Sequence, residues 1–81
     1  MKLNLYIVRD RILEQSSAVS EAKNDAVALR NFEKVMAGNE FRSDFDLYQI
    51  GWFDHDADRG GFLGEPRLVC ATMSTEVEDD G

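Results

Sequence analysis

The sequence contains little cysteine, histidine, proline or basic charge. The 81 residues include one cysteine, one histidine and one proline, and 9 Lys and Arg face 16 Asp and Glu. A single cysteine, Cys70, excludes an internal disulfide, and it leaves too few Cys and His side chains for a zinc site of three or four ligands. Cys70 lies in the apolar run LVCA, where we expect a buried small hydrophobe rather than a reactive thiol.

Several longer signals are also missing. No apolar run approaches the ~20 residues of a membrane helix, and the start of the chain has no basic-then-apolar signal segment. We therefore expect no membrane contact and a cytoplasmic location. No phosphate-binding glycine loop, nucleophile elbow or Cys-x-x-Cys motif is present. The sequence thus favours a non-enzymatic protein without a cofactor.

The net charge is −7, and the basic residues are spread along the chain rather than clustered. Such a protein repels phosphate backbones at long range, whereas nucleic-acid binders usually carry a basic patch. The charge therefore disfavours direct nucleic-acid binding. It fits a protein that binds a basic protein surface.

The length and composition predict one small folded domain. The apolar fraction of 43% and the charged fraction of 31% are ordinary for a globular protein. We expect a single domain over residues 1–73 and an acidic tail over residues 74–81. A domain of this size has a thin stability margin, and a free sheet edge could pair with a second copy. The sequence leaves a homodimer open.

Alternating apolar residues predict several strands. Gly51 within one of them indicates a bulge or the close approach of another backbone. Pro66 limits the pairing that follows it. The expected strands are residues 2–9, a short strand at 16–22 that could pair back on the first, residues 47–54, a short return strand that begins at 62–63 and a final strand at 67–73.

One helix is predicted over residues 25–37. Asn24 can cap its start, and Gly38 can end it in a left-handed conformation. One apolar stripe is formed by Ala28, Leu29, Phe32, Val35 and Met36, which we interpret as core packing. The fold class is therefore α+β, with one helix packed on a small, mainly antiparallel sheet, in the order β-(β)-α-β-β-(β).

The stretch DHDADRGGFLGE has the acidic spacing of a calcium loop. Asp54, Asp56, Asp58 and Glu65 match its four ligand positions. Arg59 stands where such a loop needs glycine, and the flanking helices are missing. We therefore expect a hairpin turn, with calcium binding as a lesser alternative. His55 is expected to be an exposed turn residue.

Tyr48 and Trp52 are spaced to share one face of the strand at 47–54. Aromatic side chains on a sheet face can stack bases, as in single-stranded DNA binders. Such sites also need a basic groove, whereas the nearby charges here are acidic. These two residues are therefore candidates for core filling or protein–protein contact, and base stacking is the alternative.

Three segments carry a family resemblance: MKLNLYIVRD, NDAVALRNFEKV and DLYQIGWFDHDADRG, in this order within residues 1–62. The most specific piece is residues 24–32, supported by residues 47–51 and by Phe53-Asp54. The chain resembles the small non-structural protein of gokushovirus-type microviruses, which are single-stranded DNA phages. It departs from that family's pattern at residues 20–23 and 41–44.

The resemblance implies a phage protein of the infected bacterial cytoplasm that is absent from the mature virion. Its implied role is in the switch from double-stranded to single-stranded DNA synthesis coupled to genome packaging. The expected partner is a phage replication initiator or a capsid precursor protein. No catalytic residue is carried over. Single-stranded DNA binding and a calcium-binding hairpin stay as alternative functions.

Overall fold

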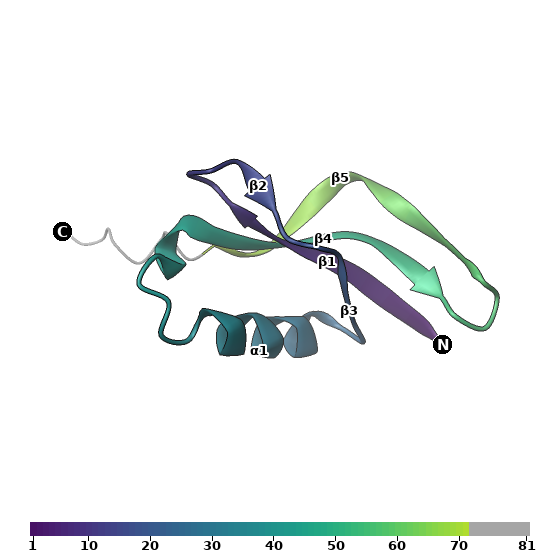
Figure 1. Ribbon diagram of the computed structural model, residues 1–81. Coiled ribbons are helices and arrows are strands. Elements are labelled where there is room, and N and C mark those ends of the chain that lie inside the picture. The colour runs from purple at the N-terminus through teal and green to yellow at the C-terminus, as the bar shows by residue number, and fades with distance from the viewer. Residues whose placement is uncertain (72–81) are drawn as a thin grey trace.

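The computed structural model describes residues 1–71 and has the predicted α+β architecture (Figure 1). Its elements are β1 (Lys2–Asp10), β2 (Gln15–Ser16), β3 (Ser20–Ala22), α1 (Asp25–Met36), the 3-10 turn η1 (Arg42–Asp44), β4 (Phe45–Asp54) and β5 (Arg59–Ala71). The predicted acidic tail at residues 74–81 lies outside the described residues. Within residues 1–71 no helix is long and apolar enough to cross a membrane.

The strands form one antiparallel sheet in the order β2-β1-β4-β5, and β3 also pairs with β1. Since β4 occupies one edge of β1, the short strands β2 and β3 lie one after the other along its other edge. The predicted short strand that pairs back on β1 is therefore confirmed, in two pieces. The central strands β1 and β4 agree with the predicted segments 2–9 and 47–54, although β4 begins at Phe45.

A large bulge of four residues separates the two halves of β5. Gln49 is paired with Arg67 and Gly51 with Phe62, so that residues 63–66 lie opposite Ile50 alone. Pro66 has no N–H to donate and falls within this unpaired stretch. The return strand at 62–63 and the final strand at 67–73 are thus not separate, because the bulge lets one strand continue past the proline. The part of the prediction beyond Ala71 lies outside the described residues.

Gly51 is required by a close backbone approach, as the sequence predicted. A Cβ atom at this position would lie 2.2 Å from the carbonyl oxygen of Gly61 on β5. The register of β4 against β5 also shifts between Gln49 and Gly51. Both predicted reasons for the glycine, a bulge and a close approach, therefore apply.

Helix α1 begins and ends as its sequence predicts. The Asn24 side chain accepts a hydrogen bond from the Val27 backbone N–H at 3.0 Å, which satisfies one of the free donors of the first turn. Gly38 has φ of +80° just beyond the last turn, a conformation that costs glycine little. The helix ends at Met36, one residue before the predicted boundary.

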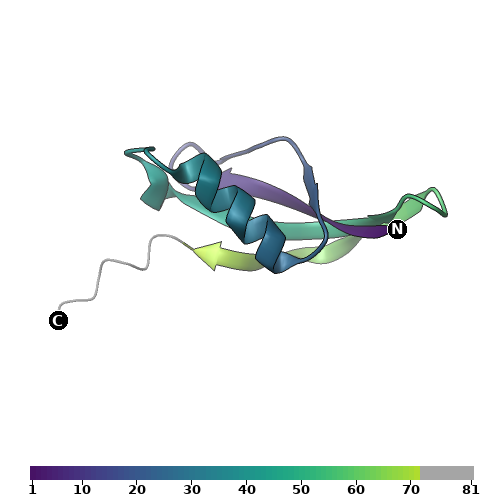
Figure 2. The same cartoon turned by 90° about the horizontal axis from the view of Figure 1, so that it is seen from below.

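The core lies between α1 and one face of the sheet (Figure 2). Its buried apolar residues are Tyr6, Ala22, Ala28, Phe32, Met36 and Leu47. Three residues of the predicted helical stripe are thus buried, and Leu29 packs against the core at its border. Val35 was expected in the core but is 68% exposed. The paired segments of β2 and β3 are too short to cover this flank of the helix.

Helix α1 packs on one of the two faces of the sheet (Figure 1). We call the face that carries Tyr6 the helix face and the opposite one the open face. Directly paired residues point to the same face, and successive residues alternate. Tyr48 is paired with Ile7 and Trp52 with Asn4, which stand three residues apart on β1. Tyr48 therefore lies on the open face and Trp52 on the helix face.

The prediction that Tyr48 and Trp52 share a face is wrong for a physical reason. The register between β1 and β4 shifts between Leu5 and Tyr6, so that Ile50 is an extra residue on β4 without a partner on β1. An extra residue reverses the alternation of every side chain beyond it. The two aromatic residues consequently cannot form one stacking platform.

Candidate protein-interaction site

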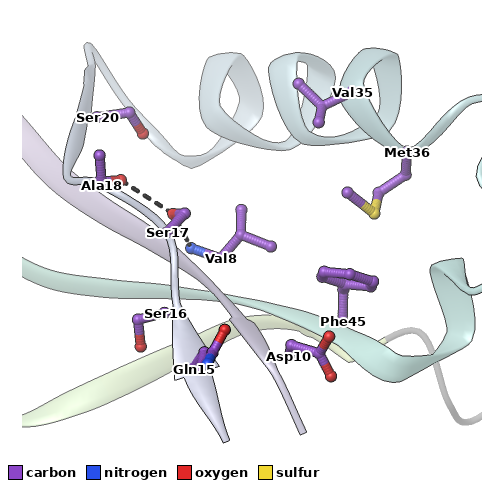
Figure 3. A pocket seen from close by; sticks show the side chains of 10 residues that line it. All are labelled: Val8, Asp10, Gln15, Ser16, Ser17, Ala18, Ser20, Val35, Met36 and Phe45. Atoms are coloured by element: carbon purple, nitrogen blue, oxygen red, sulfur yellow. Dashed lines mark hydrogen bonds between the residues drawn. The ribbon is translucent and has the colours of Figure 1, made fainter. Parts of the chain in front are cut away.

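An apolar groove lies beside the second half of α1 (Figure 3). It has a volume of about 430 Å³ and lies between the helix, β1 and the β2–β3 segment. In Figure 3, the side chains of Val8, Val35, Met36 and Phe45 face this space from the helix, β1 and β4. The exposure of Val35 is thus explained: it forms one wall of an open groove.

A hairpin tip that connects β1 to β2 lies next to the groove. The Asp10 carboxylate accepts hydrogen bonds from the backbone N–H groups of Ile12 and Leu13, at 2.9 and 3.0 Å. Glu14 closes the turn with φ of +56°. This backbone geometry leaves the Ile12 and Leu13 side chains 69% and 65% exposed. Turn tips are normally polar, so two exposed aliphatic residues here make the tip a candidate contact surface.

Arg11 fixes the tip to the segment that precedes β4. Its backbone N–H donates to the Asp44 carbonyl at 2.8 Å, and its guanidinium donates to the Ser43 carbonyl. The same guanidinium pairs with the Asp46 carboxylate at 2.9 Å. Asp46 is only 4% exposed, and a buried charge of this kind needs a partner. The tip is therefore held in one position.

Phe41 extends the apolar surface on the far side of the tip. It is 60% exposed, and a second hollow of about 330 Å³ lies between it, Ile12 and Leu13. Asp10 and Phe45 line both this hollow and the groove, so that the two form one surface. We call it the tip surface; its principal residues are Val8, Ile12, Leu13, Val35, Met36, Phe41 and Phe45.

Carboxylates border the tip surface. Asp10 lines both hollows, and Asp44 lines the second. An apolar surface bordered by acids can accept apolar side chains of a partner that carries lysine or arginine beside them. The Asp10 carboxylate is held by the backbone N–H groups of Ile12 and Leu13, and the Asp44 backbone is fixed by the bond from the Arg11 N–H to its carbonyl. This surface is therefore suited to binding a protein, and its acids favour a basic one.

The acidic stretch forms the predicted hairpin turn between β4 and β5. The Asp54 carboxylate accepts the backbone N–H groups of Asp56 and Ala57, at 3.0 and 3.3 Å. These bonds, with the nearby N-terminal ammonium of Met1, lower the pKa of Asp54. The ammonium also contacts the Asp56 carboxylate, which raises the pKa of the ammonium. Asp58 adopts φ of +56° at the end of the turn.

The four residues that match a calcium loop are not brought together. Glu65 lies in the bulge of β5, beside Tyr48 and Pro66. Throughout residues 1–71, no group of three or more His, Cys, Asp or Glu side chains is placed to hold a metal ion. The positions of Asp54 and Asp56 are instead explained by the turn and by the Met1 ammonium.

His55 is an exposed turn residue, as expected, but the structure gives it partners. Its Nε2 atom lies 2.6 Å from a carboxylate oxygen of Glu21 on β3. Its ring meets that of Phe53 edge to face, with the centroids 4.9 Å apart. The sequence could not show this pair, because 34 residues separate His55 from Glu21.

Three other residues that the sequence singled out are partly buried in the fold: Trp52, Tyr48 and Cys70. Trp52 is half-buried, with the Lys2 ammonium 4.7 Å from its ring centre. Tyr48 is half-buried on the open face. Cys70 packs against the core, and burial raises the pKa of its thiol. Cys70 therefore behaves as the small hydrophobe that the sequence predicted.

Sequence reasoning missed the tip surface. The segment DRILEQ has no clear period, so that its pattern predicts neither a helix nor a strand. The available signal was an Ile-Leu pair within a short polar stretch that follows a strand and begins with an aspartate. Aspartate commonly starts a turn, and a turn would expose the two aliphatic side chains that follow.

Comparisons with known proteins place the chain in a family. Neither curated proteins nor solved structures gave a match to the chain. The family model described as "Phage ORF5 protein" matches residues 3–75, which include the helix and all of the strands except Lys2, the first residue of β1. This chain therefore belongs to the Phage ORF5 protein family.

Proposed function

We propose that this phage protein is a non-enzymatic regulator that acts through protein–protein contacts made by the tip surface. Its partner is a basic phage protein, either the replication initiator or a capsid precursor, and the phage is of the microvirus type. The process is the switch from double-stranded to single-stranded DNA synthesis coupled to packaging. The protein acts in the cytoplasm of the infected cell and is absent from the mature virion.

The single observation that carries the proposal is the exposed aliphatic pair, Ile12 and Leu13, on a hairpin tip that hydrogen bonds fix in place. Ile12 and Leu13 are more than half exposed, and exposing them has no benefit for folding. Asp10 and Arg11 hold the turn through hydrogen bonds. A tip that is ordered before binding loses less conformational entropy when a partner covers it. Apolar side chains presented in this way are typical anchors of a protein interface.

The charge supports a basic partner. The chain carries −7 overall, which would steer a basic surface toward it and speed association at low salt. The same charge disfavours a role as a coat on DNA. The resemblance to microvirus non-structural proteins supports the process, because the role that it implies is in the switch to single-stranded DNA synthesis coupled to packaging.

Affinity capture from infected cells tests the proposal. Tagged full-length protein is compared with the double variant Ile12→Ser/Leu13→Ser, with Val19→Ser as a matched control. Val19 is 54% exposed in the segment between β2 and β3 and does not line the groove. We expect the wild type and the control to recover the initiator or the capsid precursor, and the double variant to recover at least ~10-fold less.

Two results would contradict the proposal. The first is recovery of neither phage protein by the wild type from cells that express both. The second is equal recovery by the wild type and the tip variant. Circular dichroism spectra of the purified variants provide the folding control, and we expect no change because both substituted side chains lie mainly in solvent.

A further inference from the structure

The open face of the sheet carries three apolar rows. The pairing of β1, β4 and β5 aligns Leu5 with Gly51 and Phe62, and Ile7 with Tyr48 and Leu68. Leu3 and Phe53 form the third row. Phe62 and Leu68 are 78% and 50% exposed. Helix α1 lies on the other face (Figures 1 and 2), and no helix within residues 1–71 covers this one.

We propose that a second copy of this chain covers the open face, so that the protein is a homodimer with two sheets packed face to face. This arrangement is independent of the tip surface. Sheets that pack in this way lie about 10 Å apart and bury the side chains of both inner faces. Each copy would then have a helix on its outside and a shared apolar layer at the centre of the dimer.

The available area is close to what a stable dimer needs. A fully exposed aromatic side chain presents roughly 200 Å², so that Phe62, at 78% exposure, presents about 150 Å². With Leu68 and the half-buried rows, the apolar area is on the order of 500 Å². The polar ends of the face raise this toward the ~800 Å² that each partner buries in a standard interface.

The charges at the ends of the face suit two identical partners. One end carries Arg9 and Glu65, which line a hollow beside Tyr48. The other end carries the His55–Glu21 pair. A two-fold axis that lies between the two faces and runs across the strands brings the Arg9 end of one copy to the Glu21 end of the other. Arg9 of each copy then faces the Glu21 end of the other, so that the contact occurs twice, as a two-fold interface requires.

Edge pairing is the less favourable way to form a dimer. The outer edge of β5 is interrupted by the bulge at residues 63–66, which includes Pro66. Bulges and proline are the features that keep edge strands from pairing with another chain. The sequence did not decide whether the protein forms a homodimer. The structure favours packing through the open face over pairing through the outer edge of β5.

Sedimentation equilibrium of the full chain over about 1–200 µM tests the proposal. The expected mass is 2 × 9.2 kDa, or 18.4 kDa. The double variant Phe62→Ser/Leu68→Ser should raise the dimer dissociation constant at least ~30-fold. The control Val35→Ser removes an apolar side chain of 68% exposure from α1, and it should leave the dissociation constant unchanged.

Three outcomes would overturn the proposal: a mass of 9.2 kDa at every concentration, an unchanged dissociation constant in the double variant, or an equal loss in the Val35→Ser control. A dimer paired through strand edges would give the second result. If the double variant does not give the circular dichroism spectrum of the wild type, the single variant Phe62→Ser takes its place, because that side chain is 78% exposed.

Discussion

Replacing Tyr6 with phenylalanine removes one hydroxyl from the most buried side chain of the core. Tyr6 is fully buried. Its hydroxyl donates a 2.8 Å hydrogen bond to the Asp25 carboxylate and accepts one of 3.1 Å from the Asn4 amide. These contacts tie β1 to the first turn of α1. The substitution keeps the ring and the packing, so that it isolates the two hydrogen bonds.

The expected loss in free energy of unfolding depends on the hydrogen bonds that Asp25 keeps after the substitution. A hydrogen bond to a charged group contributes about 1.5–3 kcal/mol, and a neutral one about 1 kcal/mol. Asp25 keeps two bonds of 2.8 Å from the Arg67 guanidinium, and its side chain is 43% exposed, so that water replaces part of the loss. We expect the free energy of unfolding at pH 7 to fall by about 1–2 kcal/mol.

The pH dependence gives a second, independent signature. The Arg67 guanidinium, followed by the Tyr6 hydroxyl, lowers the pKa of Asp25 below 3.8 in the folded state. A lowered pKa contributes stability above the unfolded value, and this stability is lost as the pH falls through the folded value. Tyr6→Phe moves the folded pKa back toward 3.8, so that the free energy of unfolding of the variant should fall less below about pH 4.

Urea unfolding at pH 7 and at pH 3 measures both effects. Tyr48→Phe is the matched control, because Tyr48 is half-buried on the open face; its expected change is below about 0.5 kcal/mol. The reasoning is refuted if Tyr6→Phe costs no more than Tyr48→Phe at pH 7. It is also refuted if the difference between Tyr6→Phe and the wild type is the same at both pH values.

Two further predictions concern the backbone. Asn24→Ala removes the cap of α1 and should cost about 1 kcal/mol in urea unfolding, whereas Asn31→Ala, exposed within the helix, should cost nothing. Gly51→Ala would place a Cβ atom 2.2 Å from the Gly61 carbonyl oxygen and should cost roughly 1–3 kcal/mol or more. Gly64→Ala meets no atom within 4 Å, and it should stay within about 0.5 kcal/mol of the wild type. An equal loss of stability in Asn24→Ala and Asn31→Ala would contradict the role of the cap. An equal loss in Gly51→Ala and Gly64→Ala would contradict the close backbone approach at Gly51.

The elements that could be predicted from the sequence depend on local patterns. Helix α1 has an Asn cap, a period of about 3.6 residues and a terminal glycine, and each of these acts within a few residues. The strands β1 and β4 alternate over most of their length. The role of Gly51 could also be predicted, because glycine weakens the interior of a strand and is typical of bulges and close backbone approaches.

The features that could not be predicted depend on register. The extra residue at Ile50 moves Trp52 to the face opposite Tyr48. Gly51 indicated a bulge, but the sequence does not show which residue is extra or against which neighbouring strand. The bulge opposite Ile50 lets β5 pass Pro66, although proline usually ends a strand. Val35 has the right helical position for the core, but whether it is covered depends on how far β2 and β3 extend.

The candidate site was harder to predict than the fold. The sequence directed attention to Tyr48, Trp52 and the acidic turn, because aromatic residues and spaced carboxylates resemble known binding patterns. The structure instead presents Ile12 and Leu13 on a turn that Asp10 holds. Exposure of an aliphatic residue is a property of the folded surface, and a sequence pattern without a period does not reveal it.

Titration of the purified protein with the purified replication initiator, and separately with the capsid precursor, tests the central claim most directly. We expect micromolar binding of one of them that weakens as salt increases. The variant Ile12→Ser/Leu13→Ser should bind at least ~10-fold more weakly, and Val19→Ser should bind like the wild type. Absence of binding to both proteins at about 50 µM, or equal binding by the tip variant, would contradict the account.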